Sequence, residues 1–179
     1  MTDAQRWTSS SSPRAATTPP ASTTATAAVG AGQESICSNA LTVGDTSGEV
    51  ERQTVSSGSP YEPVVGYSRA VRVGDRVFVA GSAPIMADGS DPPVDAYSQA
   101  KRCLEIVGDA LRQAGASLED VVRTRVYLTD AAAFDGFAKA HGEAFSEVRP
   151  ANTTVVVAAL LDPRWLLEIE AEAVVMAAE

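Results

Sequence analysis

Within the segment of residues 166 to 176, positions 167 to 173 alternate between apolar and acidic side chains, and no other segment constrains the fold as strongly. Glu168, Glu170 and Glu172 occupy every second position, and the positions between them hold only apolar residues, namely Leu167, Ile169, Ala171 and Ala173. Successive side chains of a β-strand point to opposite faces of the sheet. The segment is therefore predicted to be a long final strand with one buried face and one acidic face.

The residues before this strand predict a small α+β domain. The runs Ala70–Val73 and Arg76–Ala80 flank Gly74-Asp75, a typical two-residue hairpin turn. A helix is predicted over Ala100–Ala114, entered through Pro92-Pro93 and stopped by Gly115. A strand follows at Val121–Leu128, with Val122, Thr124, Val126 and Leu128 on one side. The last two predicted elements before the final strand are a helix capped by Asp130 and ended by Pro150, and a buried strand at Thr153–Ala159. The predicted order is ββαβαββ.

Residues 1 to about 50 differ in composition from the rest of the chain. They are mostly Ala, Ser, Thr and Pro, and up to Gln33 the only aliphatic side chain larger than Ala, apart from Met1, is Val29. Such a segment has too little apolar surface to offset the entropy of ordering, so it is predicted to be a disordered extension. Arg6 and Arg14 also suggest a transit peptide, and another alternative is a true start near Val50. The folded domain is assigned to residues 51–179.

The charge balance and the rarer residues exclude several function classes. Lys and Arg number 14 against 23 Asp and Glu, a formal net charge of −9, which argues against a nucleic-acid partner. The longest apolar run, Val155–Leu161, is too short to span a membrane. Two Cys and one His cannot form an ordinary closed zinc site, and no glycine-rich nucleotide motif follows a predicted strand. We expect a soluble, cytoplasmic protein that needs no metal or cofactor and has no membrane partner.

Few side chains are predicted to be free for chemistry. His141 lies between Phe137 and Phe145 on an apolar helix stripe, which indicates a packed core or interface histidine more than a catalytic base. Cys103 is expected in the core, and Cys37 as an exposed thiol of the extension. Glu170 and Glu172 are expected on a solvated face opposite partners such as Arg123 and Arg125, while a carboxylate of this strand that lined a cleft could hold a water or move a proton.

The pair Gly81-Ser82 ends the second predicted strand and is a further candidate. A glycine at this position allows a ligand to approach the backbone, whose N–H and C=O groups can then bind it. Backbone donors of this kind can stabilise negative charge that develops during a reaction. The pair could equally be an ordinary turn at the end of a strand.

Several segments, in this order along the chain, resemble one known family. They are Gly66-Tyr67-Ser68-Arg69-Ala70-Val71, Val79-Ala80-Gly81-Ser82-Ala83-Pro84, residues 121–130 and Leu167-Glu168-Ile169-Glu170-Ala171. The chain resembles the Rid family, the YjgF-like reactive-intermediate deaminases, over roughly Pro60 to Ala178. The resemblance implies a chorismate-mutase-like fold, a homotrimer with clefts between subunits, and hydrolysis of small imines or enamines without a cofactor.

The resemblance also implies roles for individual residues. Tyr67 matches an aromatic residue that lines the cleft, Gly81 matches a glycine whose backbone contacts the substrate, and Glu168 matches the acid that orients the attacking water. Deaminating members carry Pro-Ala-Arg-Ser, whose arginine grips a substrate carboxylate. Here the corresponding arginine position holds Asn152, and a nearby position that is often cysteine holds Thr154.

This departure changes the substrate that we expect. Arginine makes a bidentate, charged pair with a carboxylate, whereas asparagine offers only neutral hydrogen bonds. We therefore expect an enzyme that acts on a small imine, enamine or carbonyl compound without a free carboxylate. Tyr67, Asn152 and Thr154 are expected to bind the substrate, and the expected catalytic residues are Glu168, Gly81 and Ser82. The alternative is a non-catalytic trimer that binds small molecules, or acts like a chaperone, through the same cleft. A ribonuclease fits the acidic composition poorly.

Overall fold

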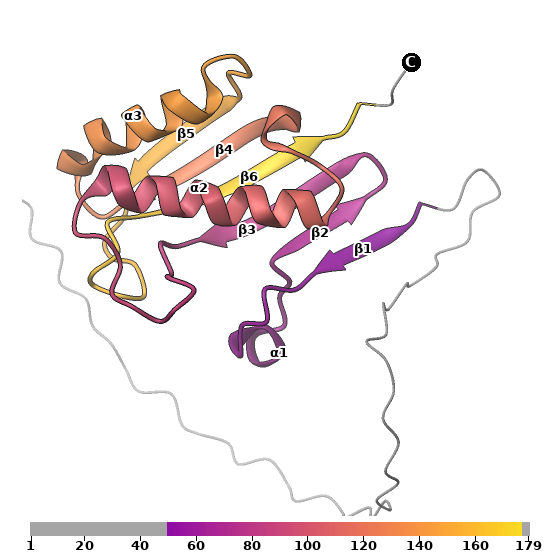
Figure 1. The fold of residues 1–179 in the computed structure, drawn as a ribbon, viewed down its shortest axis with the longest axis horizontal. Helices are drawn as coiled ribbons and strands as arrows, with labels where there is room; N and C mark the ends of the chain where they lie inside the picture. Colours follow the sequence, from indigo (N-terminus) through magenta and orange to yellow (C-terminus); the bar gives the residue numbers. More distant parts are fainter. Residues whose placement is uncertain (1–49, 177–179) are drawn as a thin grey trace, which may run out of the picture. The chain divides into compact units, whose positions relative to one another are not determined.

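The protein is described by a computed structural model that covers residues 50–176 and shows one six-stranded sheet in the order β1-β2-β3-β6-β4-β5. The strands are β1 (Arg52–Val55), β2 (Ala70–Val73), β3 (Arg76–Ser82), β4 (Val121–Leu128), β5 (Ala151–Val156) and β6 (Leu167–Val174). The helices in Figure 1 are α1 (Tyr61–Val65), α2 (Ala96–Gln113) and α3 (Phe134–Phe145). The predicted extension, as far as residue 49, and Cys37 lie outside the described residues.

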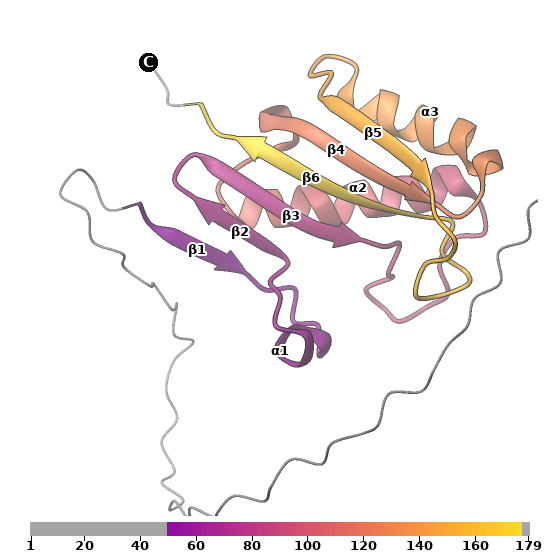
Figure 2. The same cartoon turned by 180° about the vertical axis from the view of Figure 1, so that it is seen from behind.

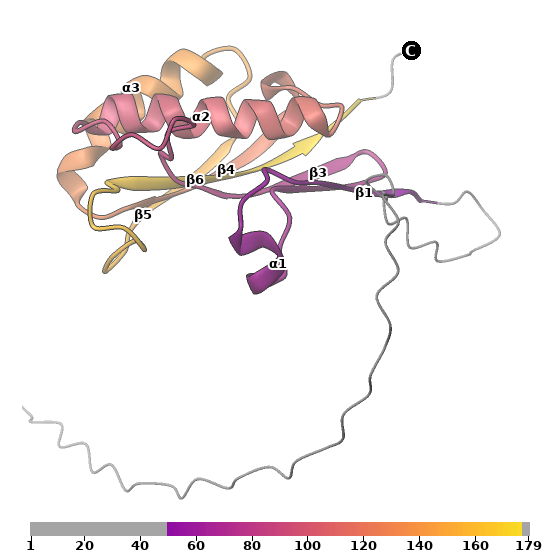
Figure 3. The ribbon, with the colours of Figure 1, turned by 60° about the horizontal axis from the view of Figure 1, so that its bottom comes forward.

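The sheet is covered by long helices on one face only. α2 and α3 lie side by side on that face, and the short α1 lies on the other side (Figure 3). The view from behind in Figure 2 shows the opposite face, which we call the open face. The core lies between the two layers and includes the buried side chains Leu104, Val107, Leu111, Phe137, Leu167 and Ile169. The predicted α+β architecture is confirmed.

The alternating pattern of the last strand has the predicted consequence. Along β6 every second residue from Leu167 to Ala173 is buried against the helices, and Glu168, Glu170 and Glu172 are partly exposed on the open face. β6 is antiparallel to both of its neighbours, β3 and β4. The acidic residues therefore lie in the middle of the sheet rather than at its rim.

A strand is present where one was predicted at Thr153–Ala159, but its predicted burial and bounds are wrong. The strand is β5, Ala151–Val156, and it forms the edge of the sheet, paired only with β4 in parallel. Val155 and Val156 are 43% and 56% exposed in the single subunit. The apolar run was interpreted as burial within one subunit, but an edge strand has a neighbour on one side only.

Three other local features were not predicted. β1 has mostly exposed residues and α1 is only five residues long, so neither has the apolar periodicity by which strands and helices are found. The ladder between β4 and β6 shifts register between Val121 and Arg123. Because of this shift Val121 is buried and Val122 is exposed, so Val122 does not face the same way as Thr124.

Candidate active site

The carboxyl group of Glu168 lies directly against the backbone of Gly81. A Cβ atom at Gly81 would collide with Glu168 Oε1, so the carboxylate fills the space that any other residue's side chain would need. The ladder between β3 and β6 shifts register between Val79 and Ser82, which marks a β-bulge at this point. Bulges commonly lie next to active sites because they redirect side chains and backbone groups. The structure thus brings together two of the predicted residues, Glu168 and Gly81.

Arg69, for which no role was predicted, fixes this end of β3. Its Nη1 donates to the carbonyl oxygens of Ala80 and Gly81, at 3.2 and 2.7 Å, and to Ser82 Oγ at 3.1 Å. Its guanidinium also lies 5.9 Å from the ring centroid of Tyr67. Arg69 stands within the Gly66–Val71 segment, but an arginine that binds backbone carbonyls across a hairpin has no sequence pattern of its own.

The hydroxyl of Ser82 is bonded within the protein and is not free for chemistry. The side chain is buried, and Oγ donates to the carbonyl oxygen of Ala80 at 3.0 Å while it accepts from Arg69. Its hydroxyl is therefore committed within the bulge. The structure places Ser82 in the candidate site as a structural residue.

The electrostatic environment of Glu168 favours proton exchange closer to neutral pH. Burial raises the pKa of the Glu168 carboxyl above its usual range, the Arg69 guanidinium lowers it, and the carboxylate of Glu170 raises it. Carboxyl groups with raised pKa values can take up and release protons under physiological conditions. Glu168 combines this environment with contact to the partly exposed Gly81, and both features suit an acid–base group.

The other two acidic residues of β6 form ion pairs within the sheet. Arg125 on β4 contacts Glu170 at 2.9 Å through Nη1 and Glu172 at 2.8 Å through Nη2. The hydroxyl of Tyr127 donates to Glu170 at 3.2 Å. The predicted cross-strand pairing with an arginine is confirmed for Glu170 and Glu172, so Glu168 differs from both in lacking such a partner among the described residues.

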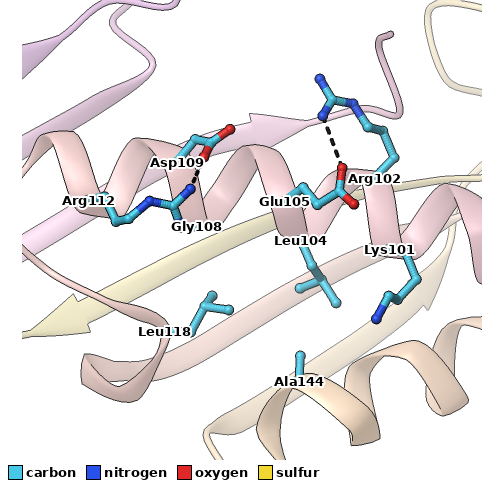
Figure 4. A pocket seen from close by; sticks show the side chains of 9 residues that line it. All are labelled: Lys101, Arg102, Leu104, Glu105, Gly108, Asp109, Arg112, Leu118 and Ala144. Atoms are coloured by element: carbon cyan, nitrogen blue, oxygen red, sulfur yellow. Dashed lines mark hydrogen bonds and ion pairs between the residues drawn. The ribbon is translucent and has the colours of Figure 1, made fainter. Parts of the chain in front are cut away.

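Two of the hollows on the surface of the described part of the chain bear on the position of the site. One lies on the open face beside the bulge and is lined by residues that include Tyr67, Phe78, Ala80 and Glu170. The other, in Figure 4, lies on the outer side of α2, where Arg102 pairs with Glu105 at 3.1 Å and Arg112 pairs with Asp109. No predicted site residue lines the second hollow, whereas Tyr67 lies in the first. The candidate site is therefore on the open face.

Asn152 and Thr154 point away from Glu168 within one subunit. Asn152 is paired with Thr124 in the β4–β5 ladder, and Thr124 is buried on the helix-covered face. Glu168 is paired with Tyr127 on the open face. Because paired residues have their side chains on the same face, Asn152 and Glu168 lie on opposite faces of the sheet. A cleft that contains both residues must therefore be formed by two copies of the chain.

Asn152 and Thr154 belong instead to a line of polar contacts that reaches into the core. Asn152 Nδ2 donates to Thr124 Oγ1 at 3.0 Å, and Thr154 Oγ1 donates to Asn152 Oδ1 at 2.9 Å. His141 Nε2 lies 3.0 Å from Thr124 Oγ1. The ring of His141 packs between Phe137 and Phe145, which confirms the prediction of a packed histidine.

Cys103 is a core residue, as predicted. It is buried on α2, and burial together with the nearby charge of Glu168 raises the pKa of its thiol far above the usual range. A thiol in such an environment stays protonated and unreactive.

Within residues 50–176 no group of three or more His, Cys, Asp or Glu side chains is arranged to hold a metal ion. Each helix of residues 50–176 is too short or too polar for a transmembrane span.

The contact between Gly81 and Glu168 predicts the effect of a single methyl group. Gly81→Ala should displace the Glu168 carboxylate, which is the end of a flexible side chain, and leave the backbone unchanged. We expect a loss of most activity with a melting temperature close to that of the wild type, measured by steady-state kinetics and thermal unfolding. Ala80→Gly, one residue earlier, is the control. An active Gly81→Ala protein would contradict this assignment.

The burial of His141 predicts a pH dependence of stability. Burial lowers the pKa of His141 from its ordinary value of 6.5, so the unfolded chain binds a proton at a higher pH than the folded chain. The stability that His141 contributes is therefore fully present above pH 6.5 and is lost as the pH falls below it. Urea unfolding at about pH 7.5 and about pH 5.5 should show a larger decrease for the wild type than for His141→Gln. An equal decrease would contradict the prediction.

Comparisons with known proteins agree with this architecture. A model of the endoribonuclease L-PSP family matches residues 58–175. An uncharacterised protein of Streptomyces coelicolor is 41% identical over 119 residues, which are 66% of this chain and 89% of that protein. The 3-aminoacrylate deaminase RutC of Acinetobacter baylyi is 34% identical over 108 residues, 60% of this chain and 85% of the enzyme.

Solved structures give the same result. A Mycobacterium tuberculosis member of the YjgF/YER057c/UK114 family has a TM-score of 0.64 and 45% identity, and the match covers 69% of this chain and 99% of that one. Escherichia coli TdcF, solved with bound serine, has a TM-score of 0.58 and 30% identity, covering 68% and 92%. These matches confirm the predicted YjgF-like fold.

Proposed function

This chain belongs to the endoribonuclease L-PSP family, and we propose that it hydrolyses a small imine or enamine to a carbonyl compound and ammonia without a cofactor. The observation that carries the proposal is the position of Glu168. Its half-buried carboxyl group lies against Gly81 at a β-bulge and has a raised pKa. The relative that is named a 3-aminoacrylate deaminase supports this class of reaction.

In the proposed mechanism Glu168 moves protons between water and the substrate. The carboxylate accepts a proton from a water molecule as the water oxygen attacks the imine carbon, and the protonated Glu168 then gives this proton to the substrate nitrogen. The carbinolamine that forms then loses ammonia to give the carbonyl compound. An enamine enters the same sequence after protonation at carbon. Backbone N–H groups near Gly81 and Ser82 would stabilise charge that develops during these steps.

We propose that the working site lies between subunits of a homotrimer. Glu168 and Asn152 occupy opposite faces of one sheet, so only a neighbouring copy can bring Asn152 and Thr154 to Glu168. The exposed apolar residues of the edge strand, Val155 and Val156, support such an assembly, because a contact between copies would cover them. In this arrangement Tyr67, Gly81 and Glu168 come from one subunit, and Asn152 and Thr154 come from the next.

The substrate in this proposal has no free carboxylate. Asn152 and Thr154 provide neutral hydrogen bonds at the position where an arginine would provide a charge. A hydrogen bond to a charged group contributes about 1.5–3 kcal/mol, so its absence corresponds to about a 10- to 150-fold loss of affinity for a carboxylate. A substrate with a neutral carbonyl or amide group fits this edge better.

A second candidate function is binding of a small molecule without catalysis. The related TdcF structure contains bound serine, which favours this alternative for a cleft in the same fold. Cleavage of RNA, which the family's name suggests, is not part of our proposal. The net charge of −9 would oppose the approach of a polyanion.

The proposal is tested by generating imines in the presence of the protein. An amine oxidase would supply imines from simple amines and amino-acid amides, and semicarbazide would trap the imine that escapes hydrolysis. The enzyme should decrease trapping of imines that lack a carboxylate and release ammonia faster than the uncatalysed reaction. Binding of these compounds without faster ammonia release would favour the non-catalytic alternative and overturn the proposed activity.

A further inference from the structure

The single histidine of the chain is connected to the strand edge that carries Asn152. His141 on α3, Thr124 on β4 and Asn152 with Thr154 on β5 form a continuous series of polar contacts between 2.9 and 3.0 Å. Thr124 is 1% exposed, so its hydroxyl has no access to water. The series links a residue in the core to a residue at the exposed edge.

The contact between Thr124 and His141 fits either tautomer of the ring, and we assign its direction from the proton that Thr124 has available. Thr124 Oγ1 accepts a hydrogen bond from Asn152 Nδ2, and its own single proton is available for His141 Nε2. Nε2 can accept that proton only if the imidazole is neutral and protonated at Nδ1. The surroundings favour the neutral ring, because it packs between Phe137 and Phe145 and burial lowers its pKa.

We propose that Thr124 and His141 are positioning residues that fix the carboxamide of Asn152, so that the β5 edge binds a neutral carboxamide group of the substrate and not a carboxylate. This inference rests on the proposed function and names its substrate class: an imine or enamine that carries a primary amide. Thr124 and His141 act only through Asn152 and do not themselves contact the substrate.

The groups that remain available at the edge support this choice. Asn152 keeps one N–H donor and one lone pair on Oδ1, and Thr154 keeps the lone pairs of Oγ1, because its proton is donated to Asn152. A carboxamide offers both N–H donors and a carbonyl acceptor, so it can satisfy all of these groups. A carboxylate only accepts hydrogen bonds, and most of its lone pairs would face other lone pairs.

The histidine allows a test that does not depend on catalysis. In the full-length protein, nitrogen NMR of the imidazole contains one set of ring signals, because the chain has one histidine. We expect Nδ1 to carry the proton and Nε2 to be unprotonated near neutral pH. A ring protonated at Nε2 would reverse the direction of the series and overturn the inference.

Two ligands of the same shape test the recognition. Propionamide, titrated into the protein, should shift the ring signals of His141, and it should bind about tenfold more tightly than propionate. The Thr124→Val variant should lose this preference, and Thr124→Ser, which keeps the hydroxyl, should retain it. Thr153→Val alters a neighbouring threonine on the other face of β5 and should change neither result.

The outcomes separate this inference from the proposed function. Equal binding of the two ligands, tighter binding of propionate, or no shift with propionamide up to its solubility limit would overturn the inference even if the protein hydrolyses imines. If no imine is hydrolysed but the ring signals and the amide preference behave as described, the proposed reaction fails and the recognition of a carboxamide stands.

Discussion

Glu168→Gln should lower kcat for imine hydrolysis by about a hundredfold to ten-thousandfold, because glutamine cannot accept a proton from the attacking water. The substitution preserves the shape of the side chain against Gly81, so the protein should fold and assemble like the wild type. Kinetics with in-situ imine generation and size-exclusion chromatography measure the two effects separately. Retention of the wild-type kcat would remove Glu168 from the mechanism.

Glu172→Gln is the matched control for this experiment. Glu172 lies on the same strand and the same face as Glu168, but it is paired with Arg125 at 2.8 Å. Its replacement breaks a partly exposed ion pair, which has a small effect on stability. We therefore expect Glu172→Gln to keep a kcat close to that of the wild type.

The second large effect is a change of substrate class by Asn152→Arg. A guanidinium at this position can form a bidentate, charged pair with a carboxylate, so kcat/KM for imines of free amino acids should rise by about 10- to 150-fold. Asn152 is exposed at the sheet edge, so the longer side chain can be accommodated. The kcat/KM for a carboxamide substrate should fall, because Thr124 loses its hydrogen bond from Asn152.

Thr153→Arg adds the same charge one residue further along β5. Its side chain points to the other face of the strand, so it should not improve hydrolysis of carboxylate-bearing imines. An equal gain in both variants would mean that the added charge acts at long range. No gain in Asn152→Arg would show that this position does not face the substrate.

The sequence predicts the central strands and the two long helices because their burial is periodic. The alternation along β6 places three acidic residues on one face, and the helical spacing around Cys103 and Leu111 places α2 on the other. The apolar run of β5 was interpreted as a buried strand because periodicity cannot show where a sheet ends. The same feature, exposed apolar residues at an edge, is typical of a contact between copies.

The site is predicted less completely than the fold. The resemblance to the Rid family singled out Glu168 and Gly81, which the structure brings into contact, and Asn152, which the structure places on the other face. It missed Arg69, because a guanidinium bound to backbone carbonyls leaves no spacing to detect. The polar role of His141 was missed for a similar reason: its partner, Thr124, is buried on a strand and depends on the register between β4 and β5.

A mixed-oligomer experiment tests the central claim, that one subunit supplies Glu168 and its neighbour supplies the β5 edge. Glu168→Gln and the double variant Asn152→Ala/Thr154→Ala would be expressed together with different tags, and oligomers containing both chains would be purified. Each variant alone should be nearly inactive. A trimer that contains both chains places an intact Glu168 next to an intact β5 edge at one of its three interfaces, so about a third of wild-type activity should return. Activity no higher than that of the separate variants would contradict a shared site.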